Sequence, residues 1–170
     1  MPASPPPPPA EPFRTPRLDL LPLRVADAEE MAEVLGDPAL HVFIGGAPSG
    51  AEALRARYER LVAGSPDPGE TWWNWVVRQR GDARAVGTVQ ATVTEGGRLA
   101  EVAWVIGTPW QGRGIASEAA RGLVAHLRTR GVRTVVAHIH PDHHASAAVA
   151  TAAGLSATEE TQDGEVRWRS

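Results

Sequence analysis

The segment from Trp104 to Ser117 constrains the fold of this chain more than any other part of it. A β-like run is followed by two glycines and then, without a break, by an amphipathic helix. Gly112 and Gly114 lack a Cβ, so the backbone there can curl closely around an anion. The first N–H groups of a helix have no carbonyl partners, and the helix dipole adds about half a positive charge. The segment predicts a turn that binds a phosphate group, although on the glycines alone an ordinary strand-to-helix turn is an alternative.

The elements around this turn predict a mixed sheet. Apolar residues recur at i, i+3, i+4 and i+7 in the following helix, which ends at Gly131. The β-type segments 72–80, 85–93 and 99–106 are joined by short turns and predict an antiparallel meander. A further strand at 134–140 follows the helix, so strand, helix and strand form a parallel crossover beside the meander.

The remaining elements complete an α/β (α+β) chain. We expect a strand at 17–23 and a helix capped by Asp27, with Asp27 and Glu30 as a capping-box pair. A second helix is expected after Ser49, a third at 144–153 and a last strand at 166–169. The prediction is a mostly antiparallel sheet of six to seven strands flanked by about four helices.

Composition sets the number of domains. With 170 residues, of which 42% are hydrophobic and 22% charged, the chain can bury the core of one domain. We expect this domain to span residues 13–170. Residues 1–12 contain the run Pro5–Pro9, which cannot pair in a sheet and predicts an extended or disordered tail.

Charge and hydropathy exclude several classes of partner. A formal net charge of −3 argues against nucleic-acid binding by phosphate neutralisation. No apolar run approaches the roughly 20 residues of a membrane span, and no basic and apolar leader is present, so a cytoplasmic protein is expected. The absence of cysteine excludes disulfides and a thiol nucleophile.

Four segments, in order, resemble one protein family. Gln111-x-x-Gly114-x-Ala116 matches the Arg/Gln-x-x-Gly-x-Gly/Ala signature of the GNAT superfamily of acetyl-CoA-dependent N-acetyltransferases. The other matches are Thr15–Arg24 with Ala26–Glu30, Glu101–Ile106, and His140–Ser146 with Ala153–Leu155. Between Thr15 and roughly Leu155, the chain resembles the branch typified by ribosomal-protein N-terminal acetyltransferases.

The resemblance implies the GNAT fold and acetyl-CoA as co-substrate. In that fold the fourth and fifth strands, here 99–106 and 134–140, splay apart and admit the pantetheine arm of CoA. A backbone N–H near Val105 or Ile106 is then expected to polarise the thioester carbonyl. The residues implied in CoA binding are Val105, Ile106, Gln111, Gly112, Arg113, Gly114, Ile115, Ala116, Ser117, His143 and Ser146.

The resemblance also implies candidates for the chemistry. Glu101 takes the position of a catalytic glutamate on the fourth strand, with a surface carboxylate as the alternative. Ser146 matches a serine near the CoA sulfur that can protonate it, and otherwise is a helix serine that bonds its own backbone. His143 replaces the usual asparagine and could bind pantetheine or act as acid or base. Ala150 replaces the tyrosine general acid of many members, so that mechanism is not available.

Two readings of the function remain beside the leading one. Direct acetyl transfer to a primary amine, either a protein N-terminus or a small molecule, is the leading interpretation, with the early helices and loops shaping the acceptor pocket as in the family. A degenerate member that binds acyl-CoA as a sensor or scaffold is the second. His138-x-His140-x-Asp142-His143 matches a zinc-hydrolase signature, which is the third, but no histidine follows His144 and no metal is expected.

The tryptophans of the 72–75 run also have two interpretations. Trp73 and Trp75 share one strand face with Val77, while Trp72 and Asn74 share the other. Core filling is the simpler interpretation; a wall of the acceptor site or a contact within a homodimer is the alternative.

Overall fold

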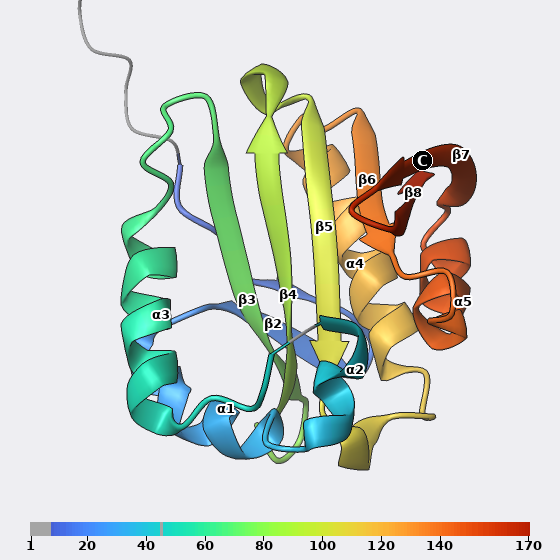
Figure 1. Ribbon diagram of the computed structural model, residues 1–170. Helices are drawn as coiled ribbons and strands as arrows, with labels where there is room; N and C mark the ends of the chain where they lie inside the picture. The colour runs from blue at the N-terminus through green and yellow to red at the C-terminus, as the bar shows by residue number, and fades with distance from the viewer. Residues whose placement is uncertain (1–7, 45) are drawn as a thin grey trace, which may run out of the picture.

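A single twisted sheet organises the computed structural model, which describes residues 8–44 and 46–170. Among these residues the sheet has eight strands in the order β1-β2-β3-β4-β5-β6-β8-β7 (Figure 1). The strands are β1 Phe13–Arg14, β2 Leu18–Pro22, β3 Thr71–Gln79, β4 Ala85–Thr94, β5 Leu99–Ile106, β6 Thr134–Ile139, β7 Ser156–Gln162 and β8 Glu165–Arg169. Every neighbouring pair is antiparallel except β5 and β6. The predicted mixed, mostly antiparallel sheet is confirmed.

Helices cover both faces of this sheet. They are α1 Ala28–Val34, α2 His41–Ile44, α3 Ala51–Ala63, α4 Ile115–Thr129 and α5 His144–Ala152. Figure 1 shows α2 in front of the end of β5 and α4 behind the strands. Helix α1 packs with α3, and α5 packs beside α4. Because α4 presents Leu123 and Leu127 fully buried to the sheet, it closes the larger of the two apolar layers.

The side chains of the central strand β3 alternate between the two faces of the sheet, as its sequence predicts. Trp73, Trp75 and Val77 lie buried in the α4 layer, whereas Trp72 and Asn74 are half-buried on the opposite face. Trp75 is fully enclosed and packs edge-on against Phe13. Core filling is therefore the role of Trp73 and Trp75.

Strands β5 and β6 separate partway along their length. They pair in parallel only at Leu99 with Thr134, Ala100 with Val135 and Glu101 with Val136. Beyond this point β5 continues to pair with β4, and β6 continues to pair with β8. The splay expected between strands 99–106 and 134–140 is confirmed, and it opens a gap on one edge of β5.

Three elements had no counterpart in the sequence prediction: β1, α2 and β7. Strand β7 reads Ser-Ala-Thr-Glu-Glu-Thr-Gln and is exposed along most of its length at the sheet edge. Such a strand has no buried face, so it carries no hydrophobic alternation to detect. Strand β1 and helix α2 span only two and four residues.

The expected capping box at the start of α1 is wrong. Asp27 makes no cap hydrogen bond to the helix. Its carboxylate instead accepts from the Arg24 N–H at 2.9 Å and from Arg78 at 3.2 Å, while Glu30 accepts from Arg78 and from the Ala85 N–H. The partly buried guanidinium of Arg78 draws both carboxylates away from the helix end because burial strengthens its ion pairs.

Part of the proline-rich stretch lies against the sheet. The indole N–H of Trp73 donates to the Pro8 carbonyl at 2.9 Å, and that of Trp75 donates to the Glu11 carbonyl at 2.8 Å. Glu11 also pairs with Arg130 at 2.8 Å. Buried indole N–H groups need acceptors, and residues 8–12 supply them. The rest of the expected tail, residues 1–7, lies outside the described residues.

No helix in the described part of the chain has both the length and the apolar character needed to cross a membrane.

Candidate active site

The loop before α4 has the geometry that its glycines predicted. Gly112 and Gly114 have φ values of 74° and 75°, in the left-handed region where glycine is favoured. The N–H groups of Gly112, Arg113 and Gly114 donate no hydrogen bond within the described chain. The first turn of α4 adds further N–H groups without carbonyl partners. The loop thus presents a cluster of free donors at the positive end of a 15-residue helix.

Gln111 and Arg113 contribute differently from each other. The Gln111 side chain donates to the Ile106 carbonyl at 3.0 Å, so it ties the loop to the end of β5. The Arg113 carbonyl accepts from Arg17 at 3.0 Å, and the Arg113 side chain is exposed. The Gln111 side chain therefore fixes the shape of the loop, and the backbone of the residues that follow it faces outward.

A carboxylate in the first turn of α4 holds the loop from behind. Glu118 accepts from the Thr15 hydroxyl, from the Arg17 N–H at 2.9 Å and from the Arg17 guanidinium at 2.7 Å. Burial acts to raise the pKa of Glu118, but these hydrogen bonds and the charge of Arg17 together lower it. The prediction named Thr15 and Arg17 only as part of a family segment and missed Glu118, because their contact spans about a hundred residues of sequence.

The hydrogen bonds between β4 and β5 determine which backbone groups of β5 face the gap. Gly107 N–H donates to the Val86 carbonyl at 2.8 Å, so alternation directs the backbone of Val105 toward β4 as well. On the other edge, Thr134 N–H donates to the Arg98 carbonyl at 3.1 Å. The same alternation directs the backbone of Trp104 and Ile106 into the gap, where β6 has already diverged. Of the two expected polarising groups, Ile106 faces the gap and Val105 does not.

Glu101 lies at the apex of the gap. It is the last β5 residue that pairs with β6, and its half-exposed carboxylate accepts a hydrogen bond from His138 Nδ1 at 2.7 Å. The other ring nitrogen of His138, Nε2, is buried and has no partner among the described residues. A buried nitrogen without a partner is costly, so it marks a place where a bound group can form a hydrogen bond.

His143 and Ser146 form a second pair at the start of α5. Ser146 Oγ lies 3.3 Å from His143 Nε2. Burial lowers the pKa of His143, and the nearby His140 lowers it further, so the ring is neutral at pH 7 and can accept from the hydroxyl. Ala150, at the position of the family tyrosine, is fully buried in the core.

The histidine run does not converge on a metal site. His138 bonds Glu101, and His140 Nδ1 accepts from the Asp142 N–H at 3.0 Å. Across residues 8–44 and 46–170, no three histidine, aspartate or glutamate side chains come together in a group that could bind a metal ion. His138 and His140 thus bond to different partners.

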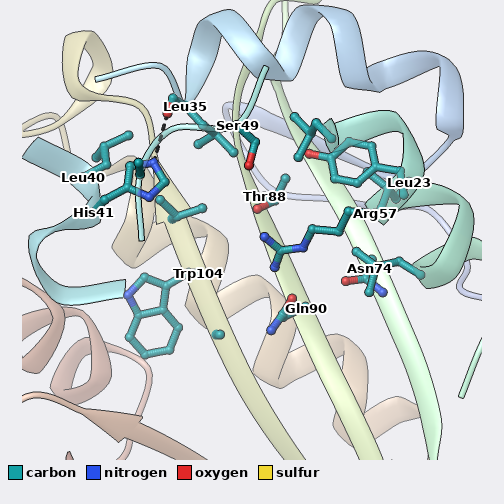
Figure 2. A pocket seen from close by; sticks show the side chains of 16 residues that line it. Leu23, Leu35, Leu40, His41, Ser49, Arg57, Asn74, Thr88, Gln90 and Trp104 are labelled. Carbon is teal, nitrogen blue, oxygen red and sulfur yellow. Dashed lines mark hydrogen bonds between the residues drawn. The ribbon is translucent and has the colours of Figure 1, made fainter. Parts of the chain in front are cut away.

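A cavity of about 390 Å³ lies on the sheet face opposite α4. Its floor is a grid of strand residues: Asn74 pairs with Gln90 and Gln90 with Ala103, while Thr88 pairs with Val105. Figure 2 shows Asn74, Thr88 and Gln90 on this floor, with Arg57 of α3 above them. Leucines line the walls: Leu23, Leu35, Leu40, Leu54 and Leu61.

The cavity borders the gap and the two early helices. Ala103, Trp104 and Val105 of β5 line it, and Glu101 lies on the same sheet face, two residues before Ala103. Burial raises the pKa of Tyr58 in its wall to about 12, so its hydroxyl stays protonated. The sequence predicted that the early helices shape a pocket, but not which residues line it, since the lining comes from six separate segments.

A family model for the acetyltransferase (GNAT) domain matches residues 17–156. The chain therefore belongs to the GNAT acetyltransferase family, whose co-substrate is acetyl-CoA. No curated protein matches the chain.

Solved structures of acetyltransferases share the fold. The GNAT acetyltransferase of Bacillus anthracis is 18% identical, with a TM-score of 0.78 over 94% of this chain and 98% of that one. The ribosomal L7/L12 α-N-protein acetyltransferase RimL, in complex with CoA, is 16% identical, with a TM-score of 0.78 over 94% and 97%. The microcin C7 self-immunity acetyltransferase MccE, in complex with acetyl-CoA and AMP, is 15% identical, with a TM-score of 0.75 over 91% and 92%.

Proposed function

We propose that this protein transfers the acetyl group of acetyl-CoA directly to a primary amine. The observation that carries the proposal is the gap between β5 and β6. The loop of free N–H groups before α4 follows directly from the gap strand β5, and the leucine-walled cavity borders it. Acetyl-CoA bound at the loop would place its thioester in the gap. An amine bound in the cavity would meet the thioester there.

The residues present fit a bound acetyl-CoA. Gly112 to Ser117 offer backbone donors for a pyrophosphate, with Gly112 and Gly114 in the conformation that allows close approach. Val105 lines the cavity, and the backbone of Ile106 faces the gap. The orphaned Nε2 of His138 offers an acceptor to an amide N–H of the pantetheine arm. The bound thioester supplies an acyl group activated for attack.

Side chains of this protein then accept and donate the protons of the reaction. Glu101 takes the proton of the attacking amine as the new C–N bond forms, and His138 holds its carboxylate in place. The N–H of Ile106 stabilises the carbonyl oxygen. As the C–S bond breaks, the Ser146 hydroxyl, which lies 3.3 Å from His143 Nε2, donates a proton to the departing thiolate and takes one from solvent in the same step, so that no alkoxide remains. With no cysteine in the chain, no acetyl-cysteine intermediate can form.

The acceptor is a protein N-terminus or a small-molecule amine of the cytoplasm. RimL is named for the α-amino group of a ribosomal protein, which supports the first kind of acceptor. A non-catalytic acyl-CoA sensor is the second candidate. The buried Ala150 favours it, because the general acid of many members is missing there.

The test is an acetyl-CoA-dependent assay on a panel of amines. Thiol release is followed with a thiol-reactive dye, and products are identified by mass spectrometry; the absence of cysteine removes the protein background. We expect thiol release together with an acetylated product for at least one class of amine. Binding of acetyl-CoA without release above background across peptides, amino acids, polyamines and aminoglycosides would favour the sensor.

A further inference from the structure

The charge of the acceptor cavity is unlike that of the whole chain. The net charge is −3, yet no aspartate or glutamate is among the described residues that line the cavity. Arg57 supplies the permanent positive charge of this lining. The cavity therefore presents a positive charge to whatever binds in it.

Arg57 has no anionic partner of its own. Arg24, Arg78 and Arg80 each pair with a carboxylate, whereas no ion pair joins Arg57 to any residue of the described chain. Figure 2 shows its guanidinium reaching from α3 over β4, between Thr88 and Gln90. An unpaired guanidinium above hydrogen-bonding side chains matches the planar, two-oxygen geometry of an oxyanion.

The floor below Arg57 offers further donors. The carboxamides of Asn74 and Gln90 and the hydroxyl of Thr88 make no side-chain hydrogen bond within the described chain. In the same row of the sheet, Ala103 is small and leaves the path toward the gap open. An acceptor anchored by its anionic end at Arg57 could thus direct its other end toward β5.

We infer, on the basis of the proposed transferase, that the acceptor amine also carries an anionic group, a carboxylate or a phosphate, and that Arg57 binds this group. The leucine walls accommodate an apolar side chain of such an acceptor. Polycationic amines are disfavoured, because their second ammonium would face Arg57 without a carboxylate to receive it.

Matched acceptors test this inference. Leucine is compared with leucinamide, and 2-aminoethyl phosphate with ethanolamine, so that the carboxylate and the phosphate are examined separately. We expect the anionic member of at least one pair to have a kcat/KM about 10- to 100-fold higher. In the leucine pair the intrinsic reactivity favours leucinamide over leucine, because the amine of leucinamide is less basic and is therefore less protonated.

Variants assign the preference to Arg57. Arg57→Gln should remove the difference within the preferred pair, and Arg57→Glu should shift the preference toward 1,4-diaminobutane. Arg55→Gln is the control, because Arg55 is exposed on the same helix and does not line the cavity. A similar rise in melting temperature with CoA in every variant shows that the fold and the CoA site are intact.

The outcomes separate this inference from the transferase proposal. Equal rates for both members of both pairs, or equal losses in Arg57→Gln and Arg55→Gln, overturn the role of Arg57 and leave the transferase standing. Absence of product with every amine overturns the transferase. Calorimetric titration of leucine and 2-aminoethyl phosphate into CoA-saturated protein then decides the inference: binding that Arg57→Gln abolishes supports it, and no binding overturns it.

Discussion

Two glutamates of this molecule differ in role because their surroundings differ. Glu118 is partly buried and accepts three hydrogen bonds from Thr15 and Arg17, so its charge is engaged in the fold. Glu101 is half exposed and bonds His138 at the apex of the β5–β6 gap. The first carboxylate supports structure, and the second is the one we propose as the general base.

Glu101→Gln should slow acetyl transfer and leave CoA binding unchanged. An amide keeps the shape of the side chain but cannot accept a proton, and loss of a general base typically costs about 10²- to 10⁴-fold in rate. Steady-state kinetics should show the loss in kcat, and thermal shift should show the same response to CoA. Glu159→Gln, on the exposed edge strand β7, is the control. A wild-type kcat would remove Glu101 from the mechanism.

Glu118→Gln should destabilise the fold in a pH-dependent way. Hydrogen bonds to a charged group contribute about 1.5–3 kcal/mol, part of which is screened because Arg17 is exposed. The pKa of Glu118 is lowered in the folded state, so its contribution is present above the ordinary carboxyl pKa and is lost as pH falls through the folded pKa.

Chemical denaturation at several pH values measures this effect. The difference in unfolding free energy between wild type and Glu118→Gln should be largest near pH 7 and should shrink below about pH 4. A difference that is constant from pH 7 to pH 3 would contradict the role of the Glu118 charge.

At the scale of elements, the loop and helix α4 form the unit that we propose as the anion-binding site. Gly112 and Gly114 give the loop its left-handed turns, α4 supplies the free N–H groups, and Gln111 ties the loop to β5. The clamp from Arg17 to Glu118 holds the unit against the first strands. The site therefore depends on strand, loop and helix keeping their register.

Gly114→Glu should abolish CoA binding. The substitution places a carboxylate where the pyrophosphate is proposed to bind, and the φ of 75° adds about 1–2 kcal/mol of backbone strain. Gly131→Glu is the matched control, because Gly131 has a φ of 93° and follows the other end of α4. Calorimetry should detect no CoA binding to Gly114→Glu and normal binding to Gly131→Glu. Equal affinities would refute the placement of the pyrophosphate.

At the scale of the whole molecule, residues 8–12 are part of the folded domain. They accept hydrogen bonds from the indoles of Trp73 and Trp75 and pair through Glu11 with Arg130 at the end of α4. Phe13, which follows them, stacks on His126 of α4. The N-terminal segment thus joins the central sheet to α4.

Deletion of residues 1–12 should lower stability by about 1–3 kcal/mol. Two indole N–H groups lose their acceptors, and each lost hydrogen bond contributes about 0.5–1.5 kcal/mol. Urea titration should show a lower midpoint, and tryptophan fluorescence should shift to longer wavelength as Trp73 gains access to water. CoA should still raise the melting temperature, because its site lies elsewhere. Unchanged fluorescence and midpoint would show that the segment does not pack in solution.

The sequence by itself determined the elements whose signals are local. The periodicity of α4, the alternation of β3 and the glycines at 112 and 114 depend on near neighbours, and each is present as predicted. The order of strand, helix and strand also determined that β5 and β6 run parallel, because a crossover leaves no other arrangement.

Tertiary structure alone decided which side chains meet. The clamp at Glu118, the pairing of His138 with Glu101 and the placement of Arg57 above β4 join segments far apart in the chain. The capping box expected at Asp27 failed because its carboxylate accepts from Arg24, three residues before it, and from Arg78, 51 residues away. Hydrogen bonds and charges act over a few ångströms of space and take no account of distance along the sequence, so the site became definite only once the sheet had brought its strands together.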